Sequence, residues 1–434
     1  MRMKEQVREQ VKWVMNMKYE DIPPEVTERA RWVLLDSVGC ILNGLNEKKL
    51  PDDSTDAILQ CSGAMLSTEL YEGNRFAVGH PASHIVPILL KEIREKNIPY
   101  REMIKIFICA YEIASRWGDA IRFSSDMLGH GTIMNAGAAV VIGLLKKLDE
   151  ETFTDYLMTS ESLPEVSTWE SVFEGSVLHD FYPGIAAVNA RNALFMTLHG
   201  SKGSEKLIRS IYQKIEGTTI TEERLSDQLG SQWFLARNYF KVYSGCRFIH
   251  PFADVIKQMM DGGLEKKEIV RIDVWTYKKA ARISQQTITN SLAAKFSTPI
   301  ALAVLLNRGR LYPEDIEEGI QDPEIGELAA KIYLREAEKY NELLPDIRGG
   351  LVRVTKKNGE ITEQEVFHAH GDFDDPNKYT EKELINKFKC ITEKKADSMT
   401  QETIIKKILK GEEQCSARKI FSEFYAIAET GGEA

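Results

Sequence analysis

The feature that most constrains the fold is a change in hydrophobic periodicity along the chain. Through about the first 237 residues, apolar side chains recur mostly at three- and four-residue spacing, which is typical of helices that bury one face. Further on, IVRIDVWTY (269–277) alternates apolar and polar residues, and residues 351–370 have the pattern of two strands joined at Asn358-Gly359, a dipeptide favoured in tight hairpins. We therefore predict a mainly α protein with a smaller α+β domain.

The helical spacing predicts individual helices in both parts of the chain. In the first part we expect helices over residues 26–45 (entered through Pro23-Pro24), 85–96, 103–117, 136–147 and 184–199. In the later part we expect helices over residues 297–307, 313–335, 381–390 and 400–410. The segments AGAAVVIG (136–143) and GIAAVNARNA (184–193) are rich in small residues, which indicates close packing against other helices. We expect the C-terminal helices to rejoin the first domain.

Length and charge narrow the classes of protein. A chain of 434 residues is long enough for two or more domains. Its formal charge is −9, from 56 Lys+Arg and 65 Asp+Glu, and no dense basic stripe offsets that charge. A nucleic-acid partner is therefore not expected. If the substrate is also acidic, the protein must gather Arg, Lys and His locally to bind it.

Cysteine spacing and glycine patterns argue against a metal or nucleotide cofactor. The six cysteines lie far apart and form no CxxC pair, so we expect reduced thiols and no zinc or iron–sulfur site. No GxGxxG or GxxxxGK pattern is present. The N-terminal sequence MRMKEQVREQ lacks the apolar stretch of a signal peptide, and the longest apolar run, 137–145, is too short to span a bilayer. We expect a cytoplasmic protein with no cofactor and no membrane association.

The eight histidines are few enough to weigh singly, and a hydrogen-bonded structural role is the alternative for each. The segment ELYEGNRFAVGHPASHIVP (69–87) fits no helix or strand pattern and contains His80, His84, Arg75 and Glu72. We interpret it as a functional loop that enters a helix near His84, where backbone N–H groups favour a bound carboxylate. The alternative is a turn and a helix cap.

Three further segments carry candidate residues. In GHGTIMNAGAA (129–139), His130 is a potential acid or base and Thr132 either positions substrate or caps the following helix. His179 and Tyr182 lie at a loop-to-helix junction in EGSVLHDFYPG (174–184). FKVYSGCRFIHPFAD (240–254) lies near the presumed domain boundary, where small-molecule sites are common. Its candidates are Lys241, Tyr243, Cys246, Arg247 and His250.

The order of these segments resembles the MmgE/PrpD family, whose members include 2-methylcitrate dehydratase, cis-aconitate decarboxylase and iminodisuccinate epimerase. The resemblance runs through nearly the whole chain. In order, its motifs are RARWVLLDSVGCILNGL (29–45), GHPASHIVPILL (79–90), AYEIASRWGDAI (110–121), GHGTIMNAGAA, GSVLHDFYPG, FKVYSGCRFIH and AAKFSTPIALAVLL (293–306).

The resemblance implies a fold, an assembly and a site. It implies a helical domain formed by both termini, residues 1–237 and 371–434, and an α+β lid over 238–370. It also implies a homodimer without metal or organic cofactor, with its active site between the domains and a small carboxylic acid as substrate.

Carried over by position, the resemblance places active-site histidines or basic residues at His80, His130, His179 and Lys241. We predict these four as the catalytic set, with His130 as the leading general acid/base. The other three are also candidates for binding substrate carboxylates. Proton abstraction beside a carboxylate needs a base and cationic or hydrogen-bonding groups that stabilise the resulting charge. The predicted substrate-binding residues are Arg75, Glu72, Thr132, Tyr182, Cys246 and His250.

The chain departs from the family pattern at three positions. Leu70 replaces an Asp that many relatives carry, with Glu69 and Glu72 flanking it, and Ile300 replaces a Tyr. His179 stands where the decarboxylase-like branch has Lys and the epimerase-like branch has Arg. The substrate therefore cannot be copied from one named relative.

The function that we predict is a cofactor-independent lyase, a dehydratase acting on a di- or tricarboxylic acid of the 2-methylcitrate type. The alternatives are an isomerase or epimerase of the iminodisuccinate type, a decarboxylase, and a non-catalytic carboxylate-binding relative, since fold resemblance alone does not establish function.

Overall fold

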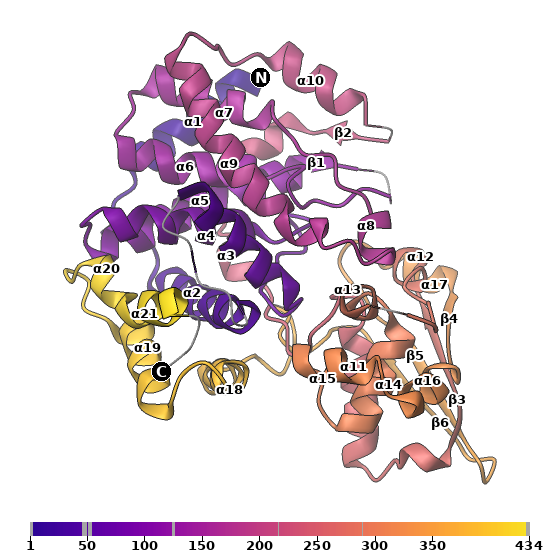
Figure 1. Cartoon of the computed structure of the whole chain (residues 1–434). Coiled ribbons are helices and arrows are strands. Elements are labelled where there is room, and N and C mark those ends of the chain that lie inside the picture. The colour runs from indigo at the N-terminus through magenta and orange to yellow at the C-terminus, as the bar shows by residue number, and fades with distance from the viewer. Residues whose placement is uncertain are drawn as a thin grey trace.

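The computed structural model describes residues 3–45, 50, 54–123, 126–215, 217–288 and 290–430. Residues 1–2 and 431–434, the two ends of the predicted helical domain, lie outside the described residues. Figure 1 shows a large helical body with a smaller lobe of strands and helices beside it. The predicted class, mainly α with a smaller α+β part, is confirmed.

The helical body is built mostly from the first half of the chain. Its helices are α1 (Met3–Asn16), α2 (Pro24–Gly44), α3 (Ser54–Ser67), α4 (Pro81–Glu95), α5 (Tyr100–Ala120), α6 (Asn135–Lys146), α7 (Glu150–Glu161), α8 (Glu170–Phe173), α9 (Leu178–Leu198) and α10 (Glu205–Gln213). A short antiparallel pair joins β1 (Ile121–Arg122) to β2 (Thr219–Ile220). Each of the five helices predicted in this part is present, and α2 begins at the Pro23-Pro24 pair.

Small residues let the central helices approach closely. A Cβ at Gly137 of α6 would lie 2.9 Å from the Cβ of Ala114 in α5 and 3.0 Å from Ile85 in α4. Close-packed interiors leave no room for such an atom without a shift of the neighbours. The small-residue face of α6 therefore packs against other helices, as its sequence predicts.

The lobe, residues 246–366, contains a four-stranded sheet with helices on it. Its helices are α11 (His250–Asp261), α12 (Lys278–Ala281), α13 (Ser291–Lys295), α14 (Thr298–Arg308), α15 (Pro313–Gly319), α16 (Pro323–Ala329) and α17 (Glu338–Asn341). Its strands are β3 (Ile269–Thr276), β4 (Ile332–Glu336), β5 (Gly350–Lys356) and β6 (Ile361–Val366), in the order β4-β3-β5-β6. β3 is parallel to β4 and antiparallel to β5, and β5 and β6 form the hairpin predicted at Asn358-Gly359.

One predicted element of the lobe is wrong. The sequence favoured one helix over residues 313–335, but the structure has α15, α16 and then β4, which pairs Ile332 with Ile272. Pro323 ends the first helix because proline lacks the N–H that an α-helix needs, and Asp322 caps the second. Pairing with β3 then draws the last residues into the sheet.

The C-terminal helices return to the helical body. They are α18 (Glu381–Thr392), α19 (Ser398–Lys410), α20 (Ala417–Ile420) and α21 (Ser422–Thr430), coloured yellow to the left of and below α2 in Figure 1. Leu384 and Phe388 of α18 belong to the same hydrophobic core as α2 and α5. Residues of the lobe form a second core, which Leu128, Trp169 and Val172 of the body join. Among the described helices, none combines the length and hydropathy that crossing a membrane requires.

Candidate active site

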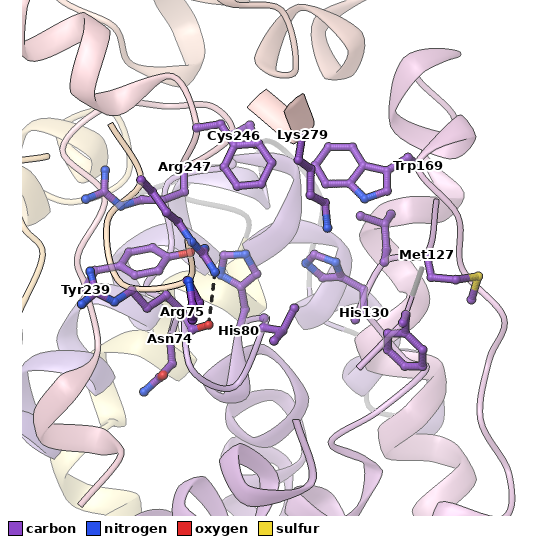
Figure 2. Close-up of a pocket in the computed structure, with 18 of the residues that line it drawn as sticks. Asn74, Arg75, His80, Met127, His130, Trp169, Tyr239, Cys246, Arg247 and Lys279 are labelled. Atoms are coloured by element: carbon purple, nitrogen blue, oxygen red, sulfur yellow. Dashed lines mark hydrogen bonds between the residues drawn. The ribbon is translucent and has the colours of Figure 1, made fainter. Parts of the chain in front are cut away.

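A cavity of about 250 Å³ lies between the helical body and the lobe. Its body-side lining comes from the loop before α4, the segment after β1 and the residues around Tyr239, and its lobe-side lining from residues 246–248, 277–279, Phe296 and 344–348. Each region has a hydrophobic core, and Leu128 and Trp169 of the body, which line the cavity, pack in the core of the lobe. This cavity is the candidate active site, and Figure 2 shows its lining.

The loop before α4 is folded tightly by local hydrogen bonds. Asn74 and Gly79 pair through their backbones, and the Asn74 carboxamide oxygen accepts from the N–H groups of Phe76 (3.0 Å) and Ala77 (3.2 Å). Gly73 is required here because a Cβ would clash with the Tyr239 hydroxyl and with His80 Nδ1. The turn thus fixes His80 at the start of α4, facing the cavity.

His80 is a neutral base with one tautomer. Its Nδ1–H donates to the carbonyl oxygen of Glu72 at 2.6 Å, so the lone pair is on Nε2. Burial and the nearby Lys241 ammonium lower the pKa of His80 to about 3. Its ring therefore enters the cavity uncharged and able to accept a proton.

His130 lies beside His80 but belongs to a different segment, the loop before α6. The two rings stack with centroids 5.1 Å apart, and Figure 2 shows them next to each other in the cavity. Burial, together with the neighbouring His179 and His80, lowers the pKa of His130 well below its usual value. Its Nε2 is 3.5 Å from the Tyr71 hydroxyl. The site thus contains two adjacent neutral imidazoles.

A buried carboxylate connects these groups to Lys241. Glu69 accepts from the Lys241 ammonium at 2.7 Å and from the Tyr71 hydroxyl at 2.8 Å. Burial by itself would raise the pKa of Glu69, but Lys241 and the neighbouring histidines outweigh it and lower the pKa to about 2. Glu69 has a left-handed backbone with φ of 46°, which is uncommon outside glycine. This conformation lies directly before Leu70, whose own side chain is in the core.

The lining is strongly cationic. It includes six cationic side chains and, among the described residues, a single carboxylate, that of Glu69. Four of the six have a carboxylate partner, in the pairs Arg75–Asp374 (2.5 Å), Arg122–Asp119 (2.6 Å), Lys241–Glu69 (2.7 Å) and Arg247–Asp372 (2.6 Å). The other two are Lys279 and Arg348. An anionic ligand is therefore favoured even though the whole chain is acidic.

The structure brings together half of the residues predicted from sequence. Those that line the cavity are His80, His130, Lys241, Arg75 and Cys246. His179 lies behind them in the first turn of α9, with its ring centroid 4.8 Å from that of His130, its Nδ1 2.9 Å from Asp180 and its Nε2 3.8 Å from Glu69. It contacts His130 and does not line the cavity.

Glu72 occupies the place that we predicted for a substrate carboxylate. Its side chain accepts from the Ala82 N–H at the N-terminus of α4 (3.1 Å) and from the Tyr111 hydroxyl (2.8 Å). Burial raises its pKa to about 7. Glu72 therefore stabilises the loop before α4, and its side chain does not line the cavity.

The other three predicted residues also lie outside the cavity lining. Thr132 is fully buried, contacts the Ser167 hydroxyl at 3.1 Å and does not cap α6, which begins at Asn135. Tyr182 is half-buried in the first turns of α9. His250 is the first residue of α11, is fully buried, and stacks edge-on against Tyr243 at 5.5 Å.

Sequence reasoning missed much of the lobe's contribution. Lys279 extends from α12 with its ammonium 5.3 Å from the Trp169 ring, and Figure 2 shows it reaching toward His130. Arg348, in the loop before β5, donates to the Arg75 carbonyl at 3.3 Å. Neither residue sits in a motif, so only the three-dimensional arrangement identifies them. Within the described ranges, no three His, Cys, Asp or Glu side chains are grouped closely enough to hold a metal ion.

Comparisons with known proteins cover both parts of the cavity. Residues 53–213 match the MmgE/PrpD N-terminal domain, and residues 243–411 match the MmgE/PrpD C-terminal domain. A cis-aconitate decarboxylase of Aspergillus terreus is 22% identical over 456 residues, covering 91% of this chain and 90% of the relative. A cis-aconitate decarboxylase of Aspergillus terreus strain NIH 2624 / FGSC A1156 matches to the same extent.

Proposed function

The chain belongs to the MmgE/PrpD family, and from this premise we propose that it is a cofactor-independent lyase that removes water from a small hydroxylated di- or tricarboxylic acid. One observation carries the proposal: two adjacent neutral imidazoles, His80 and His130, face a cavity lined by six cationic side chains. Neutral imidazoles accept protons, and cations hold carboxylates and stabilise charge that develops on them.

In the proposed reaction His80 takes the role of base, which we had first given to His130. Its Nε2 removes a proton from the carbon beside a carboxylate, since the hydrogen bond from Nδ1–H to Glu72 leaves Nε2 unprotonated. The electrons of the broken C–H bond form the C=C bond, and the C–O bond breaks. The imidazolium returns its proton to the departing hydroxide, so water leaves and His80 is neutral again.

The bound acid itself strengthens this base. In the empty cavity the low pKa of His80 makes it a weak base. A carboxylate beside an imidazole favours the charged form and raises its pKa. Lys241, whose ammonium is held by Glu69, faces the same cavity and stabilises the enolate-like charge. His130 is a further hydrogen-bonding group of the cavity lining, and Tyr71 lies behind it.

A decarboxylase is the second candidate, and a specific observation favours it. Both relatives found by comparison bear the name cis-aconitate decarboxylase and align over nine tenths of the chain. Loss of CO₂ would leave the same charge beside the remaining carboxylates. The difference is that the carbon must then be protonated, so an imidazole would have to begin as the proton donor, the reverse of the state proposed for dehydration.

The test is turnover of three acids followed by NMR in deuterated buffer. 2-Methylcitrate, citrate and cis-aconitate are each incubated with the purified protein. The proposal expects a new alkene from a hydroxy acid with all carboxylates retained. Release of CO₂ from cis-aconitate would support the decarboxylase, and entry of solvent deuterium without net change would support the epimerase alternative. No reaction with any of the three would contradict the lyase.

We also propose that the protein is a homodimer. Apolar side chains are exposed along the end of α9, where Phe195 is 64% and Leu198 is 62% exposed, and on α10 at Leu207. Exposed apolar clusters of this kind mark protein interfaces. Sedimentation equilibrium at micromolar concentration tests this, and a monomeric mass would contradict it.

A further inference from the structure

The six cations of the cavity fall into two groups by their partners. Arg75, Arg122, Lys241 and Arg247 each form an ion pair with a carboxylate of the chain. Lys279 and Arg348 have no carboxylate within ion-pair distance among the described residues, and both belong to the lobe. A cation without a counter-ion in a partly enclosed cavity is costly unless a ligand supplies the opposite charge.

Both side chains are in position to meet such a ligand. Lys279 has no hydrogen bond to a described residue, and its ammonium lies 5.3 Å from the Trp169 ring. Burial, and then repulsion from Arg348, lower the pKa of Lys279 to about 8. Both side chains line the same cavity. Arg348 uses one Nη for the Arg75 carbonyl at 3.3 Å, which leaves further donors of its guanidinium for another acceptor.

The pair enters the cavity from the lobe, whereas the proposed chemistry belongs to side chains of the helical body. His80 and His130 come from the helical body, while Lys279 enters from the lobe and points toward them in Figure 2. The cavity volume of about 250 Å³ is adequate for one compact acid. A ligand that fills it therefore touches the imidazoles on one side and the unpaired cations on the other.

We infer that Lys279 and Arg348 form a second anion subsite, which binds a carboxylate remote from the reacting carbon and so selects acids with at least two carboxylates. The inference rests on the proposed function for the class of its ligand. Charge-assisted hydrogen bonds to a partly buried carboxylate are strong, and a fork of guanidinium donors suits its two oxygens. Monocarboxylic acids would lose this contact and leave both cations unpaired.

The test measures binding of three unreactive acids that differ only in carboxylate number. Propane-1,2,3-tricarboxylate, pentanedioate and butanoate carry three, two and one, on a closely related carbon skeleton. Isothermal titration gives their dissociation constants for the wild type, Lys279→Met, Arg348→Met and the control Lys278→Met. Lys278 is the exposed neighbour of Lys279, so the control makes the same change in net charge on the same helix.

We expect the wild type and Lys278→Met to prefer the acids with two or three carboxylates. Each cavity variant should weaken binding of those acids about 10- to 100-fold and leave butanoate within about twofold. Lys279→Arg should recover most of the preference. Equal loss for all three acids, unchanged binding in both variants, or no binding by the wild type would overturn the subsite.

These outcomes separate the subsite from the proposed lyase. If the binding series behaves as expected but none of the three candidate substrates reacts, the subsite stands and the lyase fails. If a substrate turns over but the variants keep the wild-type preference, the lyase stands and the subsite fails.

Discussion

Among the described residues, the cationic side chains of the cavity that lack a carboxylate partner all belong to the lobe. In the body, Lys241 is satisfied by Glu69, and a second buried lysine, Lys387 of α18, donates to Asp36 (2.6 Å). In the lobe, Arg247 is paired with Asp372 (2.6 Å), but Lys279 and Arg348 have no carboxylate partner among the described residues. Paired charges add no net attraction for an anion, whereas unpaired cations do. This difference supports our proposal that the body holds the reacting groups in place and the lobe supplies recognition.

Lys387 offers the strongest way to test the body's half of the comparison. Its ammonium also donates to the carbonyl oxygens of Leu70 (2.6 Å) and Lys241 (2.9 Å), so it fastens two cavity segments to α18. Lys387→Met would leave Asp36 buried without its partner. We expect the free energy of unfolding to fall by about 3–5 kcal/mol, measured from the urea midpoint.

Two matched variants sharpen this prediction. Lys389, on the same helix, pairs with Glu402 at the surface, and Lys389→Met should cost less than about 1 kcal/mol. Lys279→Met removes an unpaired cation from the lobe and should not lower stability at all. Equal destabilisation by the changes at Lys387 and Lys279 would remove the distinction between body and lobe.

The pH dependence of ligand affinity also distinguishes the lobe from the body, and its expected effect is smaller than that of Lys387→Met. The pKa of Lys279 is about 8, so Lys279 is charged below that pH and neutral above it. Affinity for propane-1,2,3-tricarboxylate should therefore fall as the pH rises from about 7 to about 9, by at most about tenfold per pH unit for one proton. His80, with a pKa of about 3, stays neutral over this range and contributes no change.

Titrations of Lys279→Arg and the wild type at several pH values provide the measurement. Arginine keeps its charge at these pH values, so the variant's affinity should stay level while that of the wild type declines. A decline of the same size in both proteins would assign it to another group.

Local patterns predicted most of the fold. The three- and four-residue spacing identified α2, α4, α5, α6 and α9, and alternation identified β3 and the β5–β6 hairpin. β4 was missed because its five residues follow a helical pattern, and only pairing with β3 makes them a strand. Pairing with a distant strand is tertiary information that local propensity does not contain.

The candidate site was predictable where it lies in loops with unusual composition. His80 and His130 stand in such segments, the family resemblance added Lys241, and all three line the cavity. Glu72 was misplaced because the sequence does not show that the N-terminus of α4 is already occupied by the chain's own carboxylate. Lys279 and Arg348 resemble ordinary surface charges, and only the approach of lobe and body gives them a cavity to face.

Steady-state kinetics of His80→Gln and Lys279→Met test the central claim most directly. With the acid that turns over fastest, His80→Gln should lower kcat about 100- to 10,000-fold with little change in affinity for propane-1,2,3-tricarboxylate, while Lys279→Met should raise KM about tenfold with kcat nearly unchanged. Lys278→Met, at the exposed neighbour of Lys279, is the control and should behave as the wild type. Wild-type kcat in His80→Gln, or an equal loss of kcat in both cavity variants, would contradict the division of chemistry and recognition between body and lobe.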